Sequence, residues 1–372
     1  MVYRSLLRPI LFRLPPETAH HLALQSLSLL LAPRTINRLV ASYFTRNAFG
    51  ELRRFGLTFP NPVGLAAGFD KDGIALQALS ALGFGFVEAG TVTYHPQPGN
   101  ARPRLFRLQE DQALINRAGF NNEGAAAFSS RVVKHRPDCV LGVSIGKSKI
   151  TPLGEATEDY LASFALVYDV ADYIAINVSS PNTPQLRELQ GADQLESLLG
   201  ALQSRNQELR VESKRSMPVP LLVKLSPDLR IDELEVIVDV LRRMKIDGII
   251  AANTTISRQN LRTPEAQLTA CGEGGLSGLP LKQRATEMIA NLYRLTNGRI
   301  PIVGVGGIFT AADAWEKISA GASLVQLYTG FIYQGPGIAR EINEGLAVIL
   351  DREGFKSLDE AVGYRARELS GN

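Results

Sequence analysis

Eight short apolar runs, each separated from the next by a longer connecting segment, most constrain how this chain can fold. Runs of this kind that alternate with helical stretches are typical of βα units built around a parallel sheet. The predicted strands are residues 62–67, 85–90, 140–145, 173–178, 220–225, 248–253, 300–305 and 323–328. Eight such units predict an α/β fold, a closed (β/α)8 barrel of the TIM type. In that fold the active site lies at the carboxyl ends of the strands.

The first 45 residues follow a different pattern. One helical face carries leucines and an isoleucine between residues 6 and 14, with Arg4, Arg8 and Arg13 interspersed. A second helical stretch follows Pro15 and ends near residue 32. The pattern predicts an amphipathic, cationic helical hairpin in residues 1–45, before a barrel domain in residues 46–372. Pro9 would disturb a long first helix, so we expect that helix to start near residue 8.

Composition and charge exclude several classes of protein. The chain has 372 residues, 45% of them hydrophobic, and its formal net charge of +3 gives no reason to expect nucleic acid as a partner. Cys139 and Cys271 lack the spacing of metal ligands, so we expect no metal site and no disulfide framework. The chain contains no apolar run of roughly 18 residues, and we therefore expect no spanning helix. A reducing cytoplasm fits the cysteine usage best.

Glycine loops follow the last predicted strands. Residues 304–307 read GVGG and residues 328–330 read YTG, after the seventh and eighth runs. Loops at these positions commonly bind a phosphate through backbone N–H groups, although tight strand-to-helix turns would need glycine equally. Residues 274–278 form another glycine loop that could reach the same phosphate. The long segment 91–138 exceeds an ordinary connection and predicts a cap over the barrel mouth.

Two lysines stand where an unpaired charge would be costly. Lys71 follows the first strand, and Lys224 lies inside the apolar run LVKL. Each lysine is expected to meet an anion. The alternatives are an internal salt bridge for Lys224, and pairing of Lys71 with Asp70 or Asp72.

Asparagines gather near the predicted strand ends. An amide offers both a donor and an acceptor, which suits a ligand with alternating carbonyl and N–H groups. A single asparagine would more often cap a loop, but five on one face favour a binding role. They are Asn116, Asn121, Asn177, Asn182 and Asn253.

A serine pair is the candidate base. No histidine lies at a predicted strand end, so a Ser-His-Asp triad is not expected. Ser179 or Ser180, in the loop after the fourth strand, could act with a cofactor that accepts a hydride. Taken alone, such a pair would more often cap the loop, because an unassisted serine is a poor base.

Five motifs, taken together, resemble the quinone-dependent, membrane-associated class of the dihydroorotate dehydrogenase family. They are AAGFDKDG at 66–73, GTVT at 90–93, NRAGFN at 116–121, NVSSPNT at 177–183 and GVGGI at 304–308. The resemblance spans essentially the whole chain. It implies oxidation of dihydroorotate to orotate in pyrimidine biosynthesis, with FMN as hydride acceptor and a membrane quinone as final acceptor.

The resemblance also implies site residues. The FMN phosphate would lie against Gly278, Gly307, Tyr328 and Thr329. The flavin ring and ribityl chain would contact Ala67, Gly68, Lys71, Thr91, Ser144, Asn177 and Lys224. Ser144 is a departure, since relatives commonly have an asparagine there. Dihydroorotate would be held by Lys71, Asn116, Arg117, Ala118, Gly119, Phe120, Asn177, Asn182, Asn253 and Thr254.

The identity of one residue bears on the electron acceptor. Ser180 matches the family's base, and a cysteine at this position marks the soluble classes. The resemblance places His20, Arg107 and Tyr328 near the quinone head. The apolar, cationic hairpin suits an anionic membrane surface, or else packs on the barrel as an ordinary helix pair. We expect a monomer, peripheral on the cytoplasmic face of the cell membrane.

Three rival functions remain open at this point. A soluble dihydroorotate dehydrogenase linked to fumarate or NAD is disfavoured by Ser180 and by the hairpin. A non-catalytic membrane-surface module would not need so many polar residues at its strand ends. A barrel flavoenzyme for another substrate, such as a 2-hydroxy acid, should have a histidine base in these loops.

Overall fold

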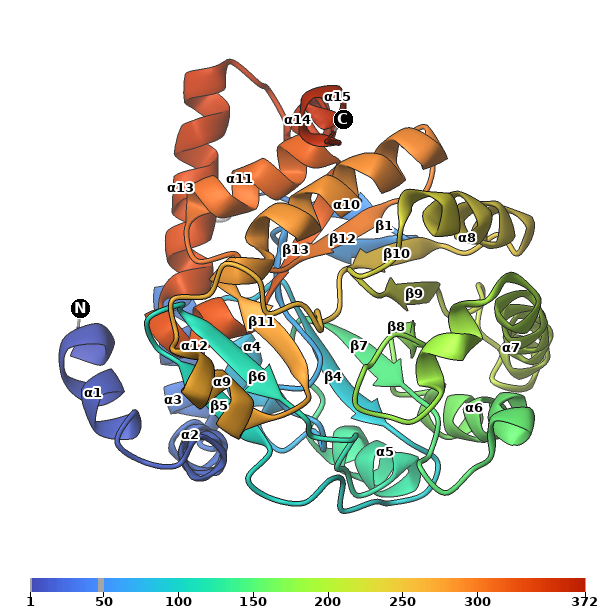
Figure 1. Ribbon diagram of the computed structural model, residues 1–372, viewed down its shortest axis with the longest axis horizontal. Helices are drawn as coiled ribbons and strands as arrows, with labels where there is room; N and C mark the ends of the chain where they lie inside the picture. The colour runs from blue at the N-terminus through green and yellow to red at the C-terminus, as the bar shows by residue number, and fades with distance from the viewer. Residues whose placement is uncertain (1, 46–49, 372) are drawn as a thin grey trace.

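A closed barrel of eight parallel strands forms the centre of the computed structural model, which describes residues 2–45 and 50–371 (Figure 1). Its strands are paired in the order β10-β12-β13-β3-β4-β7-β8-β9. Their bounds are β3 Val63–Leu65, β4 Phe86–Val92, β7 Val140–Ile145, β8 Tyr173–Asn177, β9 Leu221–Leu225, β10 Gly248–Ala251, β12 Ile302–Val305 and β13 Ala322–Leu327. The prediction of a (β/α)8 barrel with these eight strands is confirmed.

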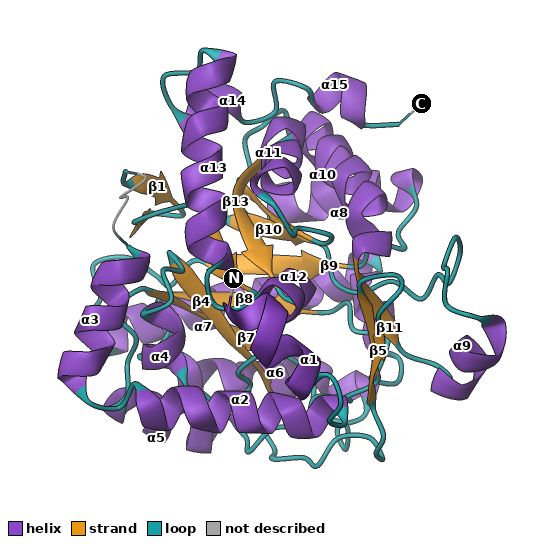
Figure 2. Ribbon diagram, turned by 90° about the vertical axis from the view of Figure 1, so that its left-hand side faces the viewer, coloured by secondary structure: helices purple, strands orange, loops and turns teal. Residues whose placement is uncertain are grey.

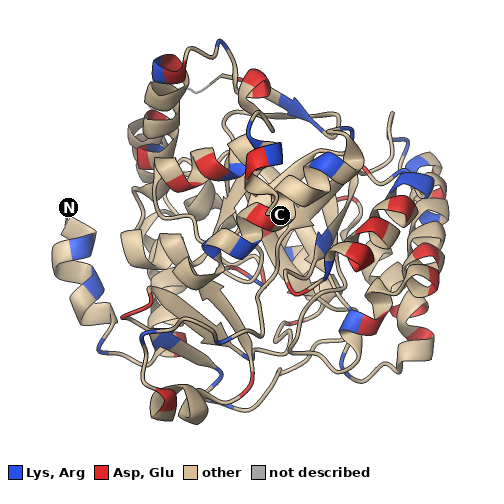
Figure 3. Cartoon of the chain, turned by 45° about the horizontal axis from the view of Figure 1, so that its top comes forward, with Lys and Arg blue, Asp and Glu red and all other residues tan. Residues whose placement is uncertain are grey.

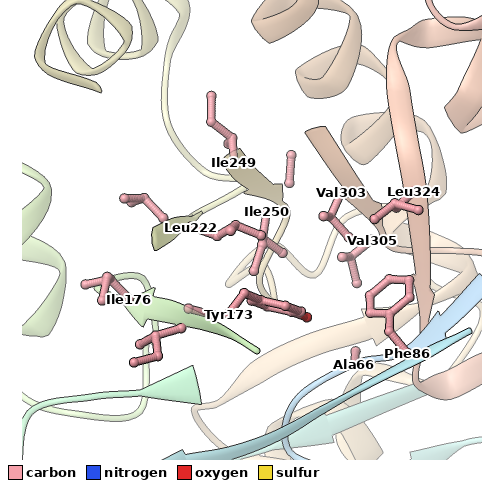
Figure 4. Close-up of a cluster of buried hydrophobic side chains, with 14 of the residues drawn as sticks. Ala66, Phe86, Tyr173, Ile176, Leu222, Ile249, Ile250, Val303, Val305 and Leu324 are labelled. Atoms are coloured by element: carbon pink, nitrogen blue, oxygen red, sulfur yellow. The ribbon is translucent and has the colours of Figure 1, made fainter. Parts of the chain in front are cut away.

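The barrel interior is filled by side chains from opposite strands, as Figure 4 shows. Two glycines make room for large aromatic rings. A Cβ on Gly64 would lie 2.4 Å from Cζ of Phe86, and one on Gly142 would lie 2.1 Å from Cζ of Tyr173. Both rings are buried, so a larger residue at either glycine would displace the core.

Helices surround the barrel on its outside (Figure 1). They are α4 Leu76–Ser80, α5 Ala125–Lys134, α6 Ala156–Val167, α7 Ala192–Glu212, α8 Ile231–Arg243, α10 Lys282–Thr296, α11 Ala311–Ala320 and α13 Ile338–Glu353. In α8 the apolar positions Leu234, Ile237 and Leu241 are buried at helical spacing against the strands. Charged residues of both signs occupy the outer faces of the helices (Figure 3).

Shorter elements complete the chain. The hairpin β1 Leu52–Arg54 and β2 Leu57–Phe59 precedes the first barrel strand. The remaining helices are α9 Glu265–Cys271, α12 Thr329–Gln334, α14 Leu358–Ala361 and α15 Ala366–Leu369. Three 3-10 turns cover Leu153–Glu155, Leu186–Gln190 and Leu279–Leu281.

A three-stranded antiparallel sheet stands beside the barrel mouth (Figure 2). Strands β5 Leu105–Leu108 and β6 Ala113–Asn116 come from the long segment predicted to form a cap, and that prediction is confirmed. The third strand, β11 Gly275–Gly278, comes from the glycine loop after the sixth barrel strand and pairs with β6. This pairing joins two segments that are far apart in the sequence, so the sequence pattern did not predict it.

The N-terminal segment holds more helix than predicted. A π-helical turn, η1 Tyr3–Leu7, runs directly into α1 Arg8–Leu11, and α2 Pro16–Leu30 follows. The expected start near residue 8 is confirmed for the α-helix, which begins at Arg8, although a π-helical turn precedes it. Pro9 lies in the first turn of α1, where a missing N–H costs little. A third helix, α3 Arg34–Phe44, was not predicted.

Polar contacts dock the first helix on the barrel through α12. The hydroxyl of Tyr3 donates to the carbonyl of Ile332 (2.6 Å), and Arg8 donates to the carbonyl of Tyr333 (3.0 Å). Leu6 and Ile10, by contrast, are each 61% exposed. Among residues 2–45 and 50–371, no helix combines the length and apolar composition needed to cross a bilayer.

Candidate active site

A large pocket opens at the carboxyl ends of the barrel strands, between the cap sheet and α2. Its empty volume is about 1510 Å³, including the open mouth. Most of the predicted site residues line it: His20, Ala67, Gly68, Lys71, Thr91, Asn116, Ala118, Gly119, Phe120, Asn177, Ser180, Asn182, Lys224, Asn253, Thr254, Gly278, Gly307, Tyr328 and Thr329. Arg107, Arg117 and Ser144 lie outside the lining. The fold thus brings residues from seven of the eight strand ends to one place.

Amides and hydroxyls form a connected network on the floor of the pocket. Asn253 donates from Nδ2 to Oδ1 of Asn177 (3.1 Å) and to Oγ of Ser179 (2.9 Å). Asn177 donates to Oγ1 of Thr91 (2.8 Å), which is also 2.9 Å from Oγ of Ser144. Ser144 thus contacts Thr91, which lines the pocket, but does not line the pocket itself. Because the amides are held by one another, their remaining donors and acceptors have fixed directions.

The two serines of the strand-four loop have different surroundings. Ser179 is fully buried and its hydroxyl lies against Asn177 and Asn253. Ser180 lines the pocket, and its Oγ accepts a hydrogen bond from the backbone N–H of Asn182 (3.2 Å). Asn182 in turn donates from its side chain to Oδ1 of Asn116 (3.0 Å). Of the two candidate serines, Ser180 lines the pocket and Ser179 does not.

Lys71 supplies a cation at the cap side of the pocket. Its Nζ donates to Oδ1 of Asn121 (3.0 Å), so this asparagine also belongs to the site. Burial and the nearby guanidinium of Arg104 lower the pKa of Lys71 to about 8. Arg104 is itself held by Glu17 of α2, at 2.7 Å. An anionic ligand group would restore the favourable charge balance around Lys71.

For Lys224 the structure shows the internal salt bridge that the sequence left open as an alternative. Its Nζ lies 3.4 Å from Oε1 of Glu88, and so the internal salt bridge exists. Lys224 also lines the pocket, where it can face a ligand. Glu88 accepts two further hydrogen bonds, from the hydroxyl of Tyr173 (3.0 Å) and from Nε2 of Gln326 (2.7 Å).

Three glycines form a cradle at the far end of the pocket. Gly307 has a φ of +70°, and a Cβ there would lie 2.4 Å from Cα of Lys282. Gly278 has a φ of +104°, and a Cβ there would lie 2.4 Å from the carbonyl oxygen of Gln112. Gly306 adds a third positive φ, of +121°. The positive φ values favour glycine at these positions, and all three residues line the pocket, where their backbone N–H groups could bind a phosphate.

Aromatic residues connect the pocket with α2. The ring of His20 lies 5.0 Å from that of Phe69, which lies 5.9 Å from the ring of Tyr328. Burial and the charge of Lys71 lower the pKa of His20 to about 3, and burial raises the pKa of Tyr328 to about 12. Both side chains are therefore neutral near pH 7. Arg107 lies behind this wall, where it donates to the carbonyl of Leu14 (2.8 Å).

Arg187, which the sequence reasoning did not single out, ties two loops of the site together. It donates to the carbonyl of Ser179 (3.2 Å) and to that of Thr254 (3.3 Å), and pairs with Asp228 at 3.1 Å. Nothing in its sequence context marked it, since its partners come from three different loops. Glu88 was also missed, although a charge inside the apolar run GFVEAG gives the same signal that identified Lys224.

No group of three or more His, Cys, Asp or Glu side chains among residues 2–45 and 50–371 is arranged to hold a metal ion.

Comparisons with known proteins agree with this geometry. The family model for dihydroorotate dehydrogenase matches residues 51–350. A dihydroorotate dehydrogenase (quinone) of Gloeobacter violaceus is 50% identical over 362 residues, which cover 97% of this chain and 98% of the relative. The protein of the same name from Mycobacterium tuberculosis is 48% identical over 368 residues, with coverage of 97% and 98%. The crystal structure of DHODH in complex with ferulenol from Eimeria tenella has a TM-score of 0.80 at 38% identity, and covers 92% of this chain and 99% of its own. This chain therefore belongs to the dihydroorotate dehydrogenase family.

Proposed function

We propose that the protein oxidises dihydroorotate to orotate, with FMN as the bound cofactor and a quinone as final electron acceptor. The observation that carries the proposal is the single pocket shared by Ser180, Lys71 and the asparagine network, with a glycine cradle at its far end. When bound, FMN would supply the hydride-accepting and electron-transfer chemistry, held by Gly278, Gly307, Lys224 and Asn177. All other steps depend on groups of this chain.

The residues present fit FMN. The cradle of Gly278, Gly306 and Gly307 suits a phosphate, because all three residues line the pocket with a positive φ and could turn backbone N–H groups toward an anion. Lys224 and Asn177 suit the polar edge of a flavin ring, with its alternating acceptors and N–H group. Gln326 lines the pocket and its buried Oε1 has no hydrogen-bond partner within the protein. An N–H group of a bound ligand could donate a hydrogen bond to this oxygen.

The substrate would lie between the cap and the floor of the pocket. Lys71 would bind the carboxylate of dihydroorotate, while Asn116, Asn182 and Asn253 would bind its ring carbonyl and N–H groups. Ser180 would then take the proton from the ring carbon next to the departing hydride. Phe120 and the cap residues beside it cover this region and would exclude water.

The N-terminal helices would provide the entry for the quinone. His20 lines the pocket from α2, close to Phe69 and Tyr328, so a lipophilic molecule could pass between α2 and the barrel. Arg107 does not line the pocket, but it would hold the segment before α2 in place through its hydrogen bond to the carbonyl of Leu14. We propose residues 1–45 as a membrane-associating segment and residues 46–372 as the catalytic domain; residues 46–49, at the boundary, lie outside the described residues. The protein would act as a monomer on the cytoplasmic face of the cell membrane.

A visible absorption spectrum tests the function directly. Purified protein is expected to show flavin absorption, and anaerobic addition of dihydroorotate is expected to bleach it. Addition of a quinone analogue should then restore the colour. A colourless protein that does not reduce the quinone analogue with dihydroorotate would overturn the proposal.

The pKa of Lys71 predicts the basic limb of the pH profile. The protonated amine binds the substrate carboxylate, and the pKa of about 8 means that this form is lost as the pH rises through 8. We expect kcat/KM for dihydroorotate, which reports the free enzyme, to fall about tenfold per pH unit above this point. Lys71→Arg keeps its charge and should move the break upward by more than one pH unit. A break at the same pH in both proteins would contradict the assignment.

A further inference from the structure

Lys224 has a negatively charged partner on the side away from the pocket. The lysine side chain is 6% exposed and that of Glu88 is 0% exposed, with 3.4 Å between Nζ and Oε1. Glu88 comes from β4 and Lys224 from β9, and the two meet inside the barrel with β7 and β8 between their strands. The pair is therefore a part of the barrel core that borders directly on the pocket.

The carboxylate of Glu88 is held by three donors. Besides Lys224, the hydroxyl of Tyr173 donates to Oε2 at 3.0 Å and Nε2 of Gln326 donates to the same oxygen at 2.7 Å. Figure 4 shows Tyr173 among the apolar side chains of the barrel interior. Burial and the negative charge of Glu88 raise the pKa of Tyr173 well above its ordinary value. Three donors, one of them the ammonium group of Lys224, therefore converge on this carboxylate.

We propose that Glu88 is a positioning residue that sets the reduction potential of the bound flavin, by limiting how much positive charge Lys224 presents to it. The inference rests on the proposed function, since it requires FMN beside Lys224. Glu88 does not line the pocket, and its influence would be exerted through Lys224 and through its own charge.

The sign follows from electrostatics. A flavin that accepts a hydride gains negative charge, so a nearby cation favours the reduced form. Glu88 opposes that cation from the opposite side and therefore favours the oxidised form. At an effective interior dielectric constant of about 20, a unit charge about 10 Å from the flavin would change the equilibrium between its oxidised and reduced forms on the order of tenfold.

Glu88→Gln tests this, because glutamine retains the shape of the side chain and removes its charge. The midpoint potential of the bound flavin, measured by anaerobic titration against a reference dye, is expected to rise. A tenfold change in the reduction equilibrium corresponds to about 30 mV for a two-electron couple. An unchanged or lower potential would overturn the inference.

Tyr173→Phe is the matched control. It removes one of the hydrogen bonds to Glu88 at the same depth but leaves every charge in place. Its potential is expected to change by less than a third of the shift in Glu88→Gln. Equal shifts in the two variants would mean that packing, and not the charge of Glu88, sets the potential.

A second substitution keeps the test decisive if Glu88→Gln does not fold. Glu88→Asp keeps the charge but places it one methylene farther from Lys224, so a smaller rise in potential is expected. Because the charge remains, a rise as large as the ~30 mV expected for its loss, or a fall in potential, would reject the inference. A wild-type protein without flavin would instead reject the proposed function, so the two failures are distinguishable.

Discussion

Replacing Ser180 by alanine is expected to slow reduction of the flavin by dihydroorotate about 100- to 10,000-fold, the usual contribution of a positioned base. Ser180 is the serine that lines the pocket, and alanine leaves no hydroxyl there to take the proton. Reoxidation of the reduced flavin by quinone requires no such proton abstraction and should be nearly unchanged. Stopped-flow absorbance of the two half-reactions, each followed alone, measures both rates.

Ser179→Ala is the matched control for this experiment. Ser179 is adjacent in sequence, but its hydroxyl lies against Asn177 and Asn253 and does not line the pocket. Loss of these contacts should slow flavin reduction less than tenfold. If Ser180→Ala slowed both half-reactions equally, or no more than Ser179→Ala does, Ser180 would not be the base.

Deletion of residues 1 to about 40 is expected to abolish vesicle binding and to impair quinone reduction much more than flavin reduction by dihydroorotate. The deleted helices expose large apolar side chains, each of which contributes roughly 1.5–3 kcal/mol when it is fully buried. They include Leu6, Leu7, Ile10, Leu29, Leu30 and Leu39, all at least 50% exposed. The deletion also removes His20, and with it the α2 wall of the pocket. Co-sedimentation with anionic vesicles and assays of the two half-reactions measure these effects.

A paired substitution separates membrane binding from the loss of structure. Leu29→Glu and Leu30→Glu change side chains that are 75% and 68% exposed, so the fold should tolerate them while vesicle binding falls. Val211→Glu alters a residue of α7, on the outer ring of helices, that is 67% exposed, and should leave vesicle binding unchanged. Unchanged vesicle binding after deletion of the helices would reject the membrane role of this segment.

The site could be predicted only in part, because the local sequence around some of its residues indicates a buried polar role and the sequence around others does not. Lys224 stood out, since a charge inside an apolar run must find a partner. Glu88 had the same signal, but its partnership with Lys224 depends on two strands facing each other across the barrel. Asn121 was noted among the asparagines, yet its contact with Lys71 required the cap to fold over the first strand.

The contacts of Arg187 and of strand β11 could not be predicted from the sequence. Arg187 joins the carbonyls of Ser179 and Thr254, which belong to loops after different strands. Strand β11 pairs with β6 across more than 150 positions of the chain. Neither contact leaves a periodic or compositional pattern, because each is made between segments that are close only in the folded protein.

The sequence by itself determined the eight strands, the barrel and the set of polar residues at the strand ends. The strands follow from local periodicity, which is visible in the sequence. When eight parallel strands close into a barrel, their carboxyl ends come together at one face, so the polar residues there also meet. The tertiary structure alone decided which serine lines the pocket, which charges pair, and how the cap and α2 complete the walls. The direction of a side chain and the partner of a buried charge are set by packing between distant segments, which no local pattern records.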